Sequence, residues 1–354
     1  MDKSHINNLH EQIKHVEADF LEFIRQRLGI VIHSHQKSEL YNTLIEACQK
    51  FDLTPRDYLQ VLKNGSNDCQ QLVHLVAGIT IGETYFFRDN NQMQLLQEHL
   101  LPEIIQLKRK QGEYSLRMWS AACSSGEDIY TIAMMLCELL PDYKKWTLQL
   151  MGTDINMSSL HKARAGRYGQ WSMRTITDYY KDKYFTVIGN QFQLSLEIMN
   201  LVRFAYLNLN ENSYPSILNG TNAQDLIVCC NVLIYFDNVS IANLMKKLAN
   251  SLVPGGFLLL GASDPVILTD TSLIHHHAHG LYFSRPMVDE IKAIPIERKP
   301  PKPVYNIITP THRVKTPHVA QTPVVPDTHV DTARISSFMG ESRWQDALSL
   351  IERY

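Results

Sequence analysis

The sequence predicts an α/β protein in which an all-helical N-terminal domain precedes a doubly wound, mostly parallel sheet with a small β insertion. Residues 1–77 carry apolar residues only at helical spacing, whereas from Ser115 onward short strand-like apolar runs alternate with helical ones. The run 225–230 is almost wholly apolar, as is typical of a parallel strand covered on both faces. The chain has 354 residues, 44% of them hydrophobic, and a chain this long buries about three quarters of its unfolded surface.

The first 80 residues are expected to form the helical domain. Apolar stripes at helical spacing run from Phe20 to Leu28, through 40–48 and through 58–62. Thr54 before Pro55 is typical of an N-cap followed by proline at the first helical position. A helix is therefore expected to start there.

Residues 81–285 are expected to form the sheet domain. Strands are expected at 115–122, 147–152, 204–207, 225–230, 257–261 and 281–284, and helices at 128–140, 156–165 and 240–252. Two further short strands flank the turn sequence Ile188-Gly189-Asn190-Gln191, which indicates a hairpin. This hairpin is the expected β insertion, near 180–196.

The end of the chain differs in composition from the rest. Nine of the 15 prolines lie between Pro286 and Pro326, so 286–332 is interpreted as an extended linker. Residues 333–354 regain helical spacing around a glycine, with Trp344 followed by Ala347 and Leu348. This pattern is similar to the start of a tetratricopeptide repeat; the alternative is a single tail helix that docks on the body.

Composition excludes several classes of protein. The net charge of −2 offers no general attraction for nucleic acid or an anionic membrane, and no apolar run approaches the 18 residues of a membrane span. The N-terminus is polar, unlike a signal peptide, and Cys229 and Cys230 are neighbours within an apolar run, as expected for reduced thiols. A cytoplasmic protein is expected. No metal site is expected, because consecutive histidines such as His275 and His276 point in different directions and are more typical of a solvated loop.

Two acidic positions follow the first strands, where a doubly wound sheet binds its ligand. The loop 123–128 opens a helix with one glycine and then Glu127 and Asp128, which would repel a diphosphate and attract an ammonium or a sulfonium. The alternative is that the two acids only stabilise the helix dipole. Asp154 ends the second strand, where a carboxylate can bind both hydroxyls of a ribose; the alternative there is a helix cap.

Two more segments are candidates for the same crevice. Asn231 ends the fourth strand, and the residues after it lack the Asn/Asp-Pro-Pro-aromatic pattern of many amine methylases. The segment 80–89 joins the helical domain to the sheet, so it can close over the crevice and bring Arg88 to a carboxylate in fork geometry. Packing plus a surface charge is the alternative for this segment.

Taken in order, these motifs resemble those of the CheR-type chemotaxis protein-glutamate methyltransferases. The resemblance covers about residues 10–285. Its motifs lie at 81–88, 119–127, 153–155, 207–209, 231–236, 255–257 and 261–264. The tail is similar to the branch of the family that carries C-terminal tetratricopeptide repeats.

The resemblance implies a class I methyltransferase-like sheet, S-adenosyl-L-methionine as cofactor and the glutamates of a methyl-accepting chemoreceptor's cytoplasmic domain as substrate. It also implies a protein partner for the repeats. The cofactor contacts it implies fall on Gly82, Thr84, Arg88, Glu127, Asp154, Asn208, Leu209, Asn231 and Val232. Gly82 stands where the family has Asn, so that contact is lost or made by backbone, and Cys230 stands where it has Arg. Family members meet the receptor with a basic helix, whereas residues 1–80 carry eight Lys/Arg against ten Asp/Glu.

The expected reaction is methyl transfer to a glutamate carboxylate, which is ionised at pH 7 and needs no general base. Asp154 is assigned to the ribose, Glu127 to the ammonium of the cofactor, and Arg88 to a carboxylate of cofactor or substrate. Tyr235 is assigned to orienting the incoming carboxylate. Two other hypotheses are a cofactor-binding regulator that docks receptors without turnover and a methylase of small carboxylic acids.

Overall fold

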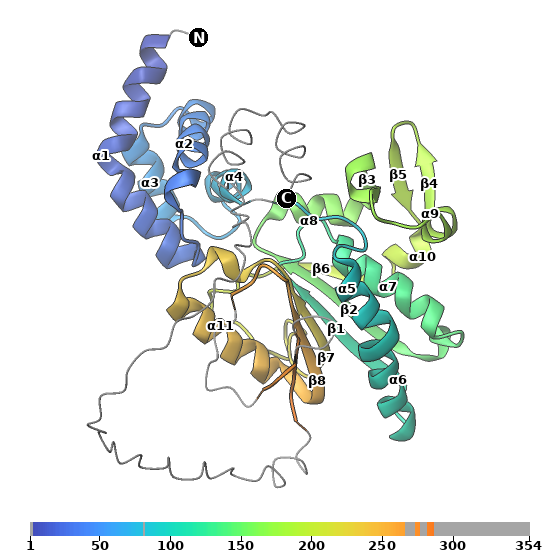
Figure 1. Cartoon of the computed structure of the whole chain (residues 1–354). Helices are drawn as coiled ribbons and strands as arrows, with labels where there is room; N and C mark the ends of the chain where they lie inside the picture. The colour runs from blue at the N-terminus through green and yellow to red at the C-terminus, as the bar shows by residue number, and fades with distance from the viewer. Residues whose placement is uncertain (1–2, 81, 266–272, 277–281, 287–354) are drawn as a thin grey trace, which may run out of the picture. The chain divides into compact units, whose positions relative to one another are not determined.

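The computed structural model describes residues 3–80, 82–265, 273–276 and 282–286 (Figure 1). All of them belong to one compact unit, Met1–Pro295. The predicted linker after Pro286 and the predicted start of a repeat at 333–354 lie outside the described residues.

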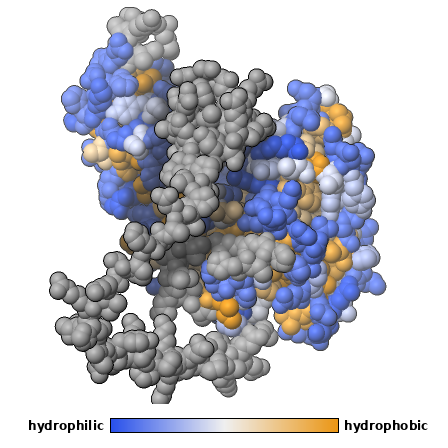
Figure 2. All heavy atoms as spheres, viewed as in Figure 1, coloured by the Kyte–Doolittle hydropathy of each residue, from blue (hydrophilic) through white to orange (hydrophobic). Residues whose placement is uncertain are grey.

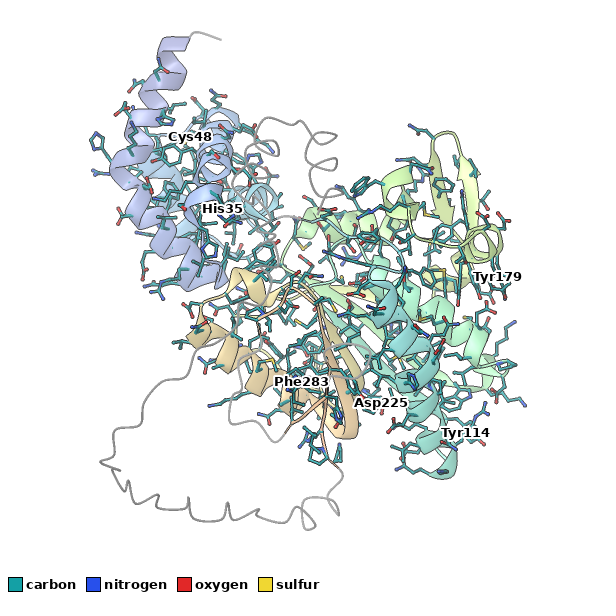
Figure 3. The ribbon with its side chains drawn as sticks, in the orientation of Figure 1. His35, Cys48, Tyr114, Tyr179, Asp225 and Phe283 are labelled. Atoms are coloured by element: carbon teal, nitrogen blue, oxygen red, sulfur yellow. The ribbon has the colours of Figure 1, made fainter. Side chains whose placement is uncertain are left out.

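The N-terminal region is helical, as predicted. It contains α1 (Lys3–Leu28), a 3-10 turn (Ser34–Gln36), α2 (Lys37–Phe51), α3 (Pro55–Asn64) and α4 (Gln70–Ile79). These helices share a core in which Phe20 and Tyr58 are fully buried, and Cys48 lies inside this region in Figure 3. The Thr54 hydroxyl accepts a hydrogen bond from the Asp57 amide at 3.2 Å, so α3 begins at the predicted N-cap.

A seven-stranded sheet follows, in the order β6-β2-β1-β7-β8-β10-β9. Its strands are β1 (Ser115–Ala121), β2 (Thr147–Asp154), β6 (Val202–Tyr206), β7 (Gln224–Cys229), β8 (Leu252–Leu260), β9 (Ile274–His276) and β10 (Tyr282–Ser284). The first five in the order pair in parallel, and β10 and β9 pair antiparallel at one edge. The predicted doubly wound, mostly parallel sheet is therefore confirmed.

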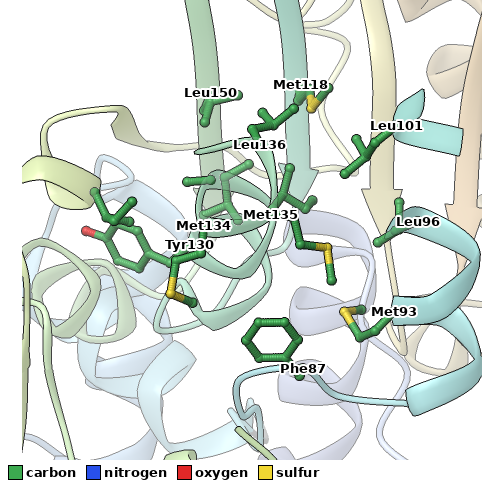
Figure 4. Packing of buried hydrophobic residues seen from close by; sticks show 14 of the residues in the cluster. Phe87, Met93, Leu96, Leu101, Met118, Tyr130, Met134, Met135, Leu136 and Leu150 are labelled. Carbon is green, nitrogen blue, oxygen red and sulfur yellow. The ribbon is translucent and has the colours of Figure 1, made fainter. Parts of the chain in front are cut away.

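Helices cover both faces of this sheet (Figure 1). One face packs against α5 (Asn90–Leu95), a π-helical turn (Leu96–Leu100), α6 (Leu101–Lys110) and α7 (Glu127–Leu139). Figure 4 shows this core, in which Met118 and Leu150 of the sheet face Leu136 of α7. The other face packs against α11 (Asn238–Ser251) and contains Trp119. Because successive side chains of a strand point to opposite faces, Met118 and Trp119 enter different cores.

The β insertion is a separate three-stranded sheet in the order β3-β5-β4. The predicted hairpin forms β4 (Phe185–Ile188) and β5 (Gln191–Leu194), and β3 (Arg167–Tyr168) adds a strand that the periodicity did not indicate. Around it lie α8 (Met157–Ala165), the 3-10 turn η4 (Gln170–Met173), α9 (Asp178–Tyr184) and α10 (Leu196–Met199). Two more 3-10 turns occur at Tyr143–Lys145 and Leu233–Tyr235.

The expectation of a loop at the histidines is wrong for His275 and His276. Both lie on β9, where their rings stack on Phe283 and Tyr282 of β10. Nε2 of His276 also lies 2.8 Å from the Ser284 hydroxyl oxygen. Pairing with β10, rather than local composition, makes this segment a strand.

The visible surface carries mainly hydrophilic residues, with apolar ones in small separate patches (Figure 2). Among the residues that the structure describes, no helix has the length and apolarity needed to cross a bilayer. Tyr114 and Asp225 mark the amino-terminal edge of the sheet in Figure 3, where Lys108 Nζ lies 3.0 Å from an Asp225 carboxylate oxygen. The functional residues gather at the opposite edge.

Candidate functional site

A cavity of about 260 Å³ lies at the carboxyl-terminal edge of the parallel strands. The ends of β1, β2, β6, β7 and β8 supply its floor, and the end of α1 and the segment 82–88 supply further walls. Nine of the predicted site residues line it: Gly82, Thr84, Arg88, Asp154, Asn208, Leu209, Asn231, Val232 and Tyr235. Parallel strands end at one edge of a sheet, so residues that are far apart in the sequence meet here.

Asp154, the last residue of β2, is part of this floor. One carboxylate oxygen accepts a hydrogen bond from the Ser124 amide and the other from the Asn156 amide, each at 2.7 Å. Burial raises the pKa of the Asp154 carboxyl, and the backbone amides oppose that shift by stabilising the ionised form. The carboxylate thus joins the loop after β1 to the start of α8 and still lines the cavity.

Glu127 is the exception among the predicted residues, because it is not among those lining the cavity. Its side chain is buried and accepts hydrogen bonds from the Ser125 hydroxyl at 2.8 Å and the Ser172 hydroxyl at 3.1 Å. Burial raises its pKa to about 7. Glu127 is therefore held at the start of α7 by two serine hydroxyls, and its contact with the ammonium of the cofactor stays a prediction.

Asp128 takes the place in the cavity wall that was expected for Glu127. Burial raises the pKa of Asp128 to about 6, and the nearby positive charge of Arg88 lowers it in part. Neighbouring helix positions point about 100° apart, so the two acids at the start of α7 point in different directions, and Asp128 is the one that lines the cavity. The two adjacent acids in the sequence predicted an acidic side chain at this place, but the sequence did not indicate how α7 is rotated about its axis.

The segment 82–88 is fixed to the sheet domain by its two phenylalanines. Phe86 is fully buried and its amide donates to the Ser172 carbonyl at 3.0 Å, while the Phe87 amide donates to the Thr131 hydroxyl at 3.2 Å. In Figure 4 the Phe87 ring lies close to Met93 and Met135. This anchoring leaves the intervening polar side chains to face the cavity.

Thr84 and Arg88 are those polar side chains. Thr84 is 8% exposed, and within the described part of the chain its hydroxyl has no hydrogen-bond partner. Arg88 Nη1 donates to the Glu83 carbonyl at 2.8 Å. Burial raises the pKa of the Tyr235 phenol, and the positive charge of Arg88 opposes that shift; both residues line the cavity.

The turn after β7 owes its shape to Asp264. The Asp264 carboxylate accepts hydrogen bonds from the amides of Asn231 at 2.6 Å, Leu233 at 2.8 Å and Gly261 at 2.8 Å. Asn231 has a φ of 57°, in the left-handed region, which asparagine tolerates better than most residues. This brings Asn231 and Val232 to the cavity, beside Cys230.

Asn208 and Leu209 connect the sheet to the helical region. The Asn208 side-chain amide donates to the Arg27 carbonyl at 2.8 Å, at the end of α1. The ammonium of Lys247 on α11 donates to the Leu209 carbonyl at 2.7 Å. Leu28 and other apolar residues beside this contact also line the cavity, so the helical region contributes part of its wall.

Several residues of the cavity were not predicted as site residues. Among them are Leu28, Ile30, Ser124, Ile155 and Asn156. Asn156 had a local signal, since it caps α8 by accepting from the Ser158 and Ser159 amides. Leu28 and Ile30 had none, because their place in the cavity depends on how α1 packs on the sheet.

The donor set of the cavity fits a ligand of mixed chemistry. Asp154 can accept hydrogen bonds from sugar hydroxyls, Asp128 can bind an ammonium, and Arg88 can bind a carboxylate. The unpartnered Thr84 hydroxyl offers one more polar contact, and Leu28, Ile30 and Ile155 can cover an apolar ring. Adenosine joined to an amino acid has all of these groups.

Comparison with known proteins identifies such a ligand. The family described as CheR methyltransferase, SAM binding domain, matches residues 82–279. Chemotaxis protein methyltransferase 2 of Vibrio cholerae is 32% identical over 250 residues, which cover 69% of this chain and 83% of that protein. A chemotaxis protein methyltransferase of Borreliella burgdorferi is 33% identical over 212 residues, or 59% of this chain and 73% of that one. The Escherichia coli chemotaxis protein methyltransferase is 32% identical over 249 residues, or 69% of this chain and 82% of that one. The matched S-adenosyl-L-methionine-binding domain contains the sheet and the cavity at its carboxyl-terminal edge, and the chain therefore belongs to the CheR methyltransferase family.

Proposed function

We propose that this methyltransferase esterifies glutamate side chains in the cytoplasmic domain of a methyl-accepting chemoreceptor. The relatives are named chemotaxis protein methyltransferases, which supports a chemoreceptor as substrate. The single observation that supports the chemistry is Arg88, a cation in the wall of the cavity that Tyr235 also lines. A guanidinium binds a carboxylate in fork geometry, and a carboxylate is the nucleophile of this reaction.

The cofactor contacts are proposed from the cavity wall. Asp154 accepts hydrogen bonds from the ribose hydroxyls, and Asn208, Leu209, Asn231 and Val232 enclose the adenosyl group. Thr84 and the backbone of Gly82 contact the methionyl end. Asp128 lines the cavity and Glu127 does not, so we assign the ammonium to Asp128, with Glu127 holding the start of α7 through Ser125.

The protein's part in the reaction is alignment and exclusion of water. Bound S-adenosyl-L-methionine supplies an electrophilic methyl group on a sulfonium. Arg88 and Tyr235 hold the glutamate carboxylate so that one oxygen points at that methyl group, and the carboxylate is ionised at neutral pH. The new oxygen–carbon bond forms as the sulfur–carbon bond breaks, and no proton has to move. This explains why no general base is needed beside Arg88.

The product distinguishes this function from other methylations. Incubation with tritiated S-adenosyl-L-methionine and membranes that contain chemoreceptors is expected to label the receptor with a methyl ester. Such an ester releases volatile methanol in mild alkali, whereas N-methyl groups survive that treatment. Alkali-stable label would refute the ester.

Substitution of Arg88 tests its role in the same assay. Arg88→Ala is expected to lower turnover about tenfold or more, because a charge-assisted contact contributes about 1.5 kcal/mol or more. Arg88→Lys is expected to restore part of it, since an ammonium does not reproduce the fork. An Arg88→Ala enzyme of normal rate would leave this residue with a packing role only.

The domain organisation is part of the proposal. We propose a helical domain over 1–80, a methyltransferase domain over 81–285, a proline-rich linker over 286–332 and the start of a tetratricopeptide-like repeat over 333–354. The sequence pattern of the last segment supports a protein partner for the repeats and the branch of the family that carries them. Action on a receptor's cytoplasmic domain requires that the protein be cytoplasmic.

A further inference from the structure

One group of side chains beside the cavity takes no part in the proposed methyl transfer. The guanidinium carbon of Arg174 lies 3.3 Å from the ring centroid of Tyr85 and 4.0 Å from that of Trp171. Trp171 is 64% exposed, whereas Trp119 and Trp146 are buried. Tyr85, Trp171 and Arg174 are called the rim stack below. An exposed tryptophan held against an arginine is typical of a binding surface rather than of a core.

The rim stack begins at the cavity itself. Tyr85 follows Thr84, and the guanidinium carbon of Arg88 lies 5.6 Å from the Tyr85 ring on the cavity side. Glu83 lines the cavity and its carboxylate lies 3.3 Å from Arg174 Nη2. An alternating row of cations and rings therefore leads from Arg88 in the cavity to Trp171 on the surface.

The stack is rigid because its two segments are joined by hydrogen bonds. The Phe86 amide donates to the Ser172 carbonyl at 3.0 Å, and the Thr175 hydroxyl donates to the Phe86 carbonyl at 2.6 Å. Arg174 Nη1 donates to the Trp171 carbonyl at 2.7 Å. A guanidinium fixed in this way loses little freedom when it binds a carboxylate.

The ion pair between Arg174 and Glu83 is easily exchanged. The Glu83 side chain is 55% exposed and the contact, at 3.3 Å, is longer than an optimal charge-assisted hydrogen bond. Exposed pairs of this kind contribute about 0–1 kcal/mol, so another carboxylate can replace Glu83 at little cost. Arg174 then keeps a partner, and Glu83 turns to solvent.

We propose that the rim stack binds an acidic side chain of the protein substrate that flanks the glutamate being methylated, with that side chain displacing Glu83 from Arg174. The occupant is an acidic segment of the chemoreceptor, chosen by charge complementarity with Arg174 and by the position of the stack beside Arg88. Trp171 covers the apolar part of the same segment. This inference rests on the proposed function, because it takes the substrate to be a protein carboxylate.

The test compares substitutions with opposite expected effects in the full-length protein. The substrate is receptor-containing membranes, and methyl transfer from tritiated S-adenosyl-L-methionine gives KM for the membranes. Arg174→Gln is expected to raise KM about tenfold with kcat unchanged, because a charge-assisted contact is lost. Glu83→Gln is expected to lower KM about threefold, because the competing carboxylate is gone. A pair that only stabilises the fold would change KM in the same direction in both variants.

A second pair of residues provides matched controls. Arg109 Nη2 lies 2.9 Å from an Asp142 carboxylate oxygen and its guanidinium carbon lies 5.8 Å from the Trp146 ring centroid, and none of the three lines the cavity. Arg109→Gln and Asp142→Asn are expected to leave KM unchanged. Calorimetric Kd values for S-adenosyl-L-methionine are expected to stay within about twofold in Arg174→Gln, Arg109→Gln and Asp142→Asn, since none of these three residues lines the cavity.

Two further measurements complete the test. Trp171→Ala is expected to raise KM about fivefold, and the increase of KM with salt is expected to be smaller in Arg174→Gln than in the unsubstituted protein. Sedimentation of the protein with the same membranes gives a Kd that needs no turnover. If Arg174→Gln leaves this Kd and KM unchanged, or if Glu83→Gln raises them, the inference is overturned. The alkali-labile label made by the unsubstituted protein reports separately on the proposed function.

Discussion

At the scale of single residues, the site is built on buried carboxylates that are held by neutral groups. Asp154 and Asp264 accept hydrogen bonds from backbone amides, and Glu127 accepts them from serine hydroxyls. No ion pair to these three carboxylates occurs within the described ranges. Burial raises the pKa of each of them. Carboxylates in this state bind hydroxyl and ammonium groups strongly. They have already lost their water on folding, so binding a ligand adds little further desolvation cost.

The Asp154 carboxylate gives the most direct prediction for cofactor binding. Asp154→Asn removes the charge and turns an amide NH₂ toward a backbone N–H. The substitution therefore weakens the contact with the cofactor and also disturbs the loop after β1, which the carboxylate holds. The Kd for S-adenosyl-L-methionine, measured by calorimetric titration, is expected to rise about thirtyfold or more, which corresponds to about 2 kcal/mol. Asp142→Asn, away from the cavity, is the control. An unchanged Kd in a folded Asp154→Asn protein would remove Asp154 from the cofactor site.

Glu127 predicts a pH dependence of stability. Its pKa is raised from 4.5 to about 7 in the folded protein, so between these values the folded state binds a proton that the unfolded state releases. The stability contributed by this proton is complete below pH 4.5 and is lost as the pH rises through about 7, by roughly 3 kcal/mol in total. Glu127→Gln does not titrate and can still bond to Ser125 and Ser172.

Urea unfolding at pH 5, 6, 7 and 8 measures this difference. The stability of Glu127→Gln relative to the unsubstituted protein is expected to increase with pH. The titration of Asp128, whose pKa is raised to about 6, is present in both proteins and cancels. Parallel stability curves would mean that Glu127 is already ionised in the folded protein at low pH.

At the scale of elements, the ends of strands and helices carry the site while their middles form the cores. The end of β8 shows how closely these ends approach one another. A Cβ atom on Gly261 would lie 2.5 Å from the Asn231 backbone nitrogen and 2.8 Å from its side-chain oxygen. Only glycine at position 261 therefore lets the turn after β7 lie this close to the end of β8, where the amides of Asn231 and Leu233 donate to the Asp264 carboxylate.

Gly261→Ala tests this approach. The added methyl group forces the Asn231 turn to move, which is expected to lower stability by about 1–3 kcal/mol and to weaken cofactor binding. Gly169→Ala is the matched control, because its Cβ would meet no atom within 4 Å and its φ is −85°. Urea unfolding and calorimetric titration check both effects. Equal behaviour of the two variants would show that the turn accommodates the methyl group.

At the scale of the whole described unit, the helical region completes the methyltransferase site. Among the contacts that join the two regions, the Asn208 and Asn210 side chains donate to the Arg27 and Gln26 carbonyls, and the Val31 amide donates to the Tyr235 carbonyl at 2.8 Å. The end of α1 thereby reaches two segments that line the cavity. Loss of this helical region would open one wall of the cavity to solvent.

The C-terminal segment gives a prediction at the same scale. Within the described ranges, the residues that line the cavity lie between Leu28 and Ser263, and Arg285 joins β10 to β8 through backbone hydrogen bonds with Gly255 and Gly256. A chain that ends at Arg285 is therefore expected to keep its Kd for S-adenosyl-L-methionine within about twofold. Titration of the shortened and full chains decides this. Weaker binding by the shortened chain would show that the tail contributes to the site.

The sequence by itself determined the fold class and most of the cavity floor. The period of the apolar residues indicates which faces of an element are buried, and it predicted the helices of the N-terminal region and the parallel strands of the sheet. Asp154 and Asn231 stand at the ends of strands that all end at one edge, so their meeting in the cavity followed from the alternation of strands and helices. The resemblance to CheR methyltransferases added Thr84, Asn208, Leu209 and Val232, which line the same cavity.

Only the tertiary structure decided the features that depend on how elements pack. The rotation of α7 placed Asp128 rather than Glu127 in the cavity wall, because packing selects which of two adjacent helix positions faces inward. The approach of α1 brought Leu28 to the ligand side, and pairing with β10 made a strand of His275 and His276. The rim stack likewise joins Tyr85 to Arg174 across 89 positions. The period of apolar residues indicates which side of one element is buried. It does not indicate which distant segments come into contact.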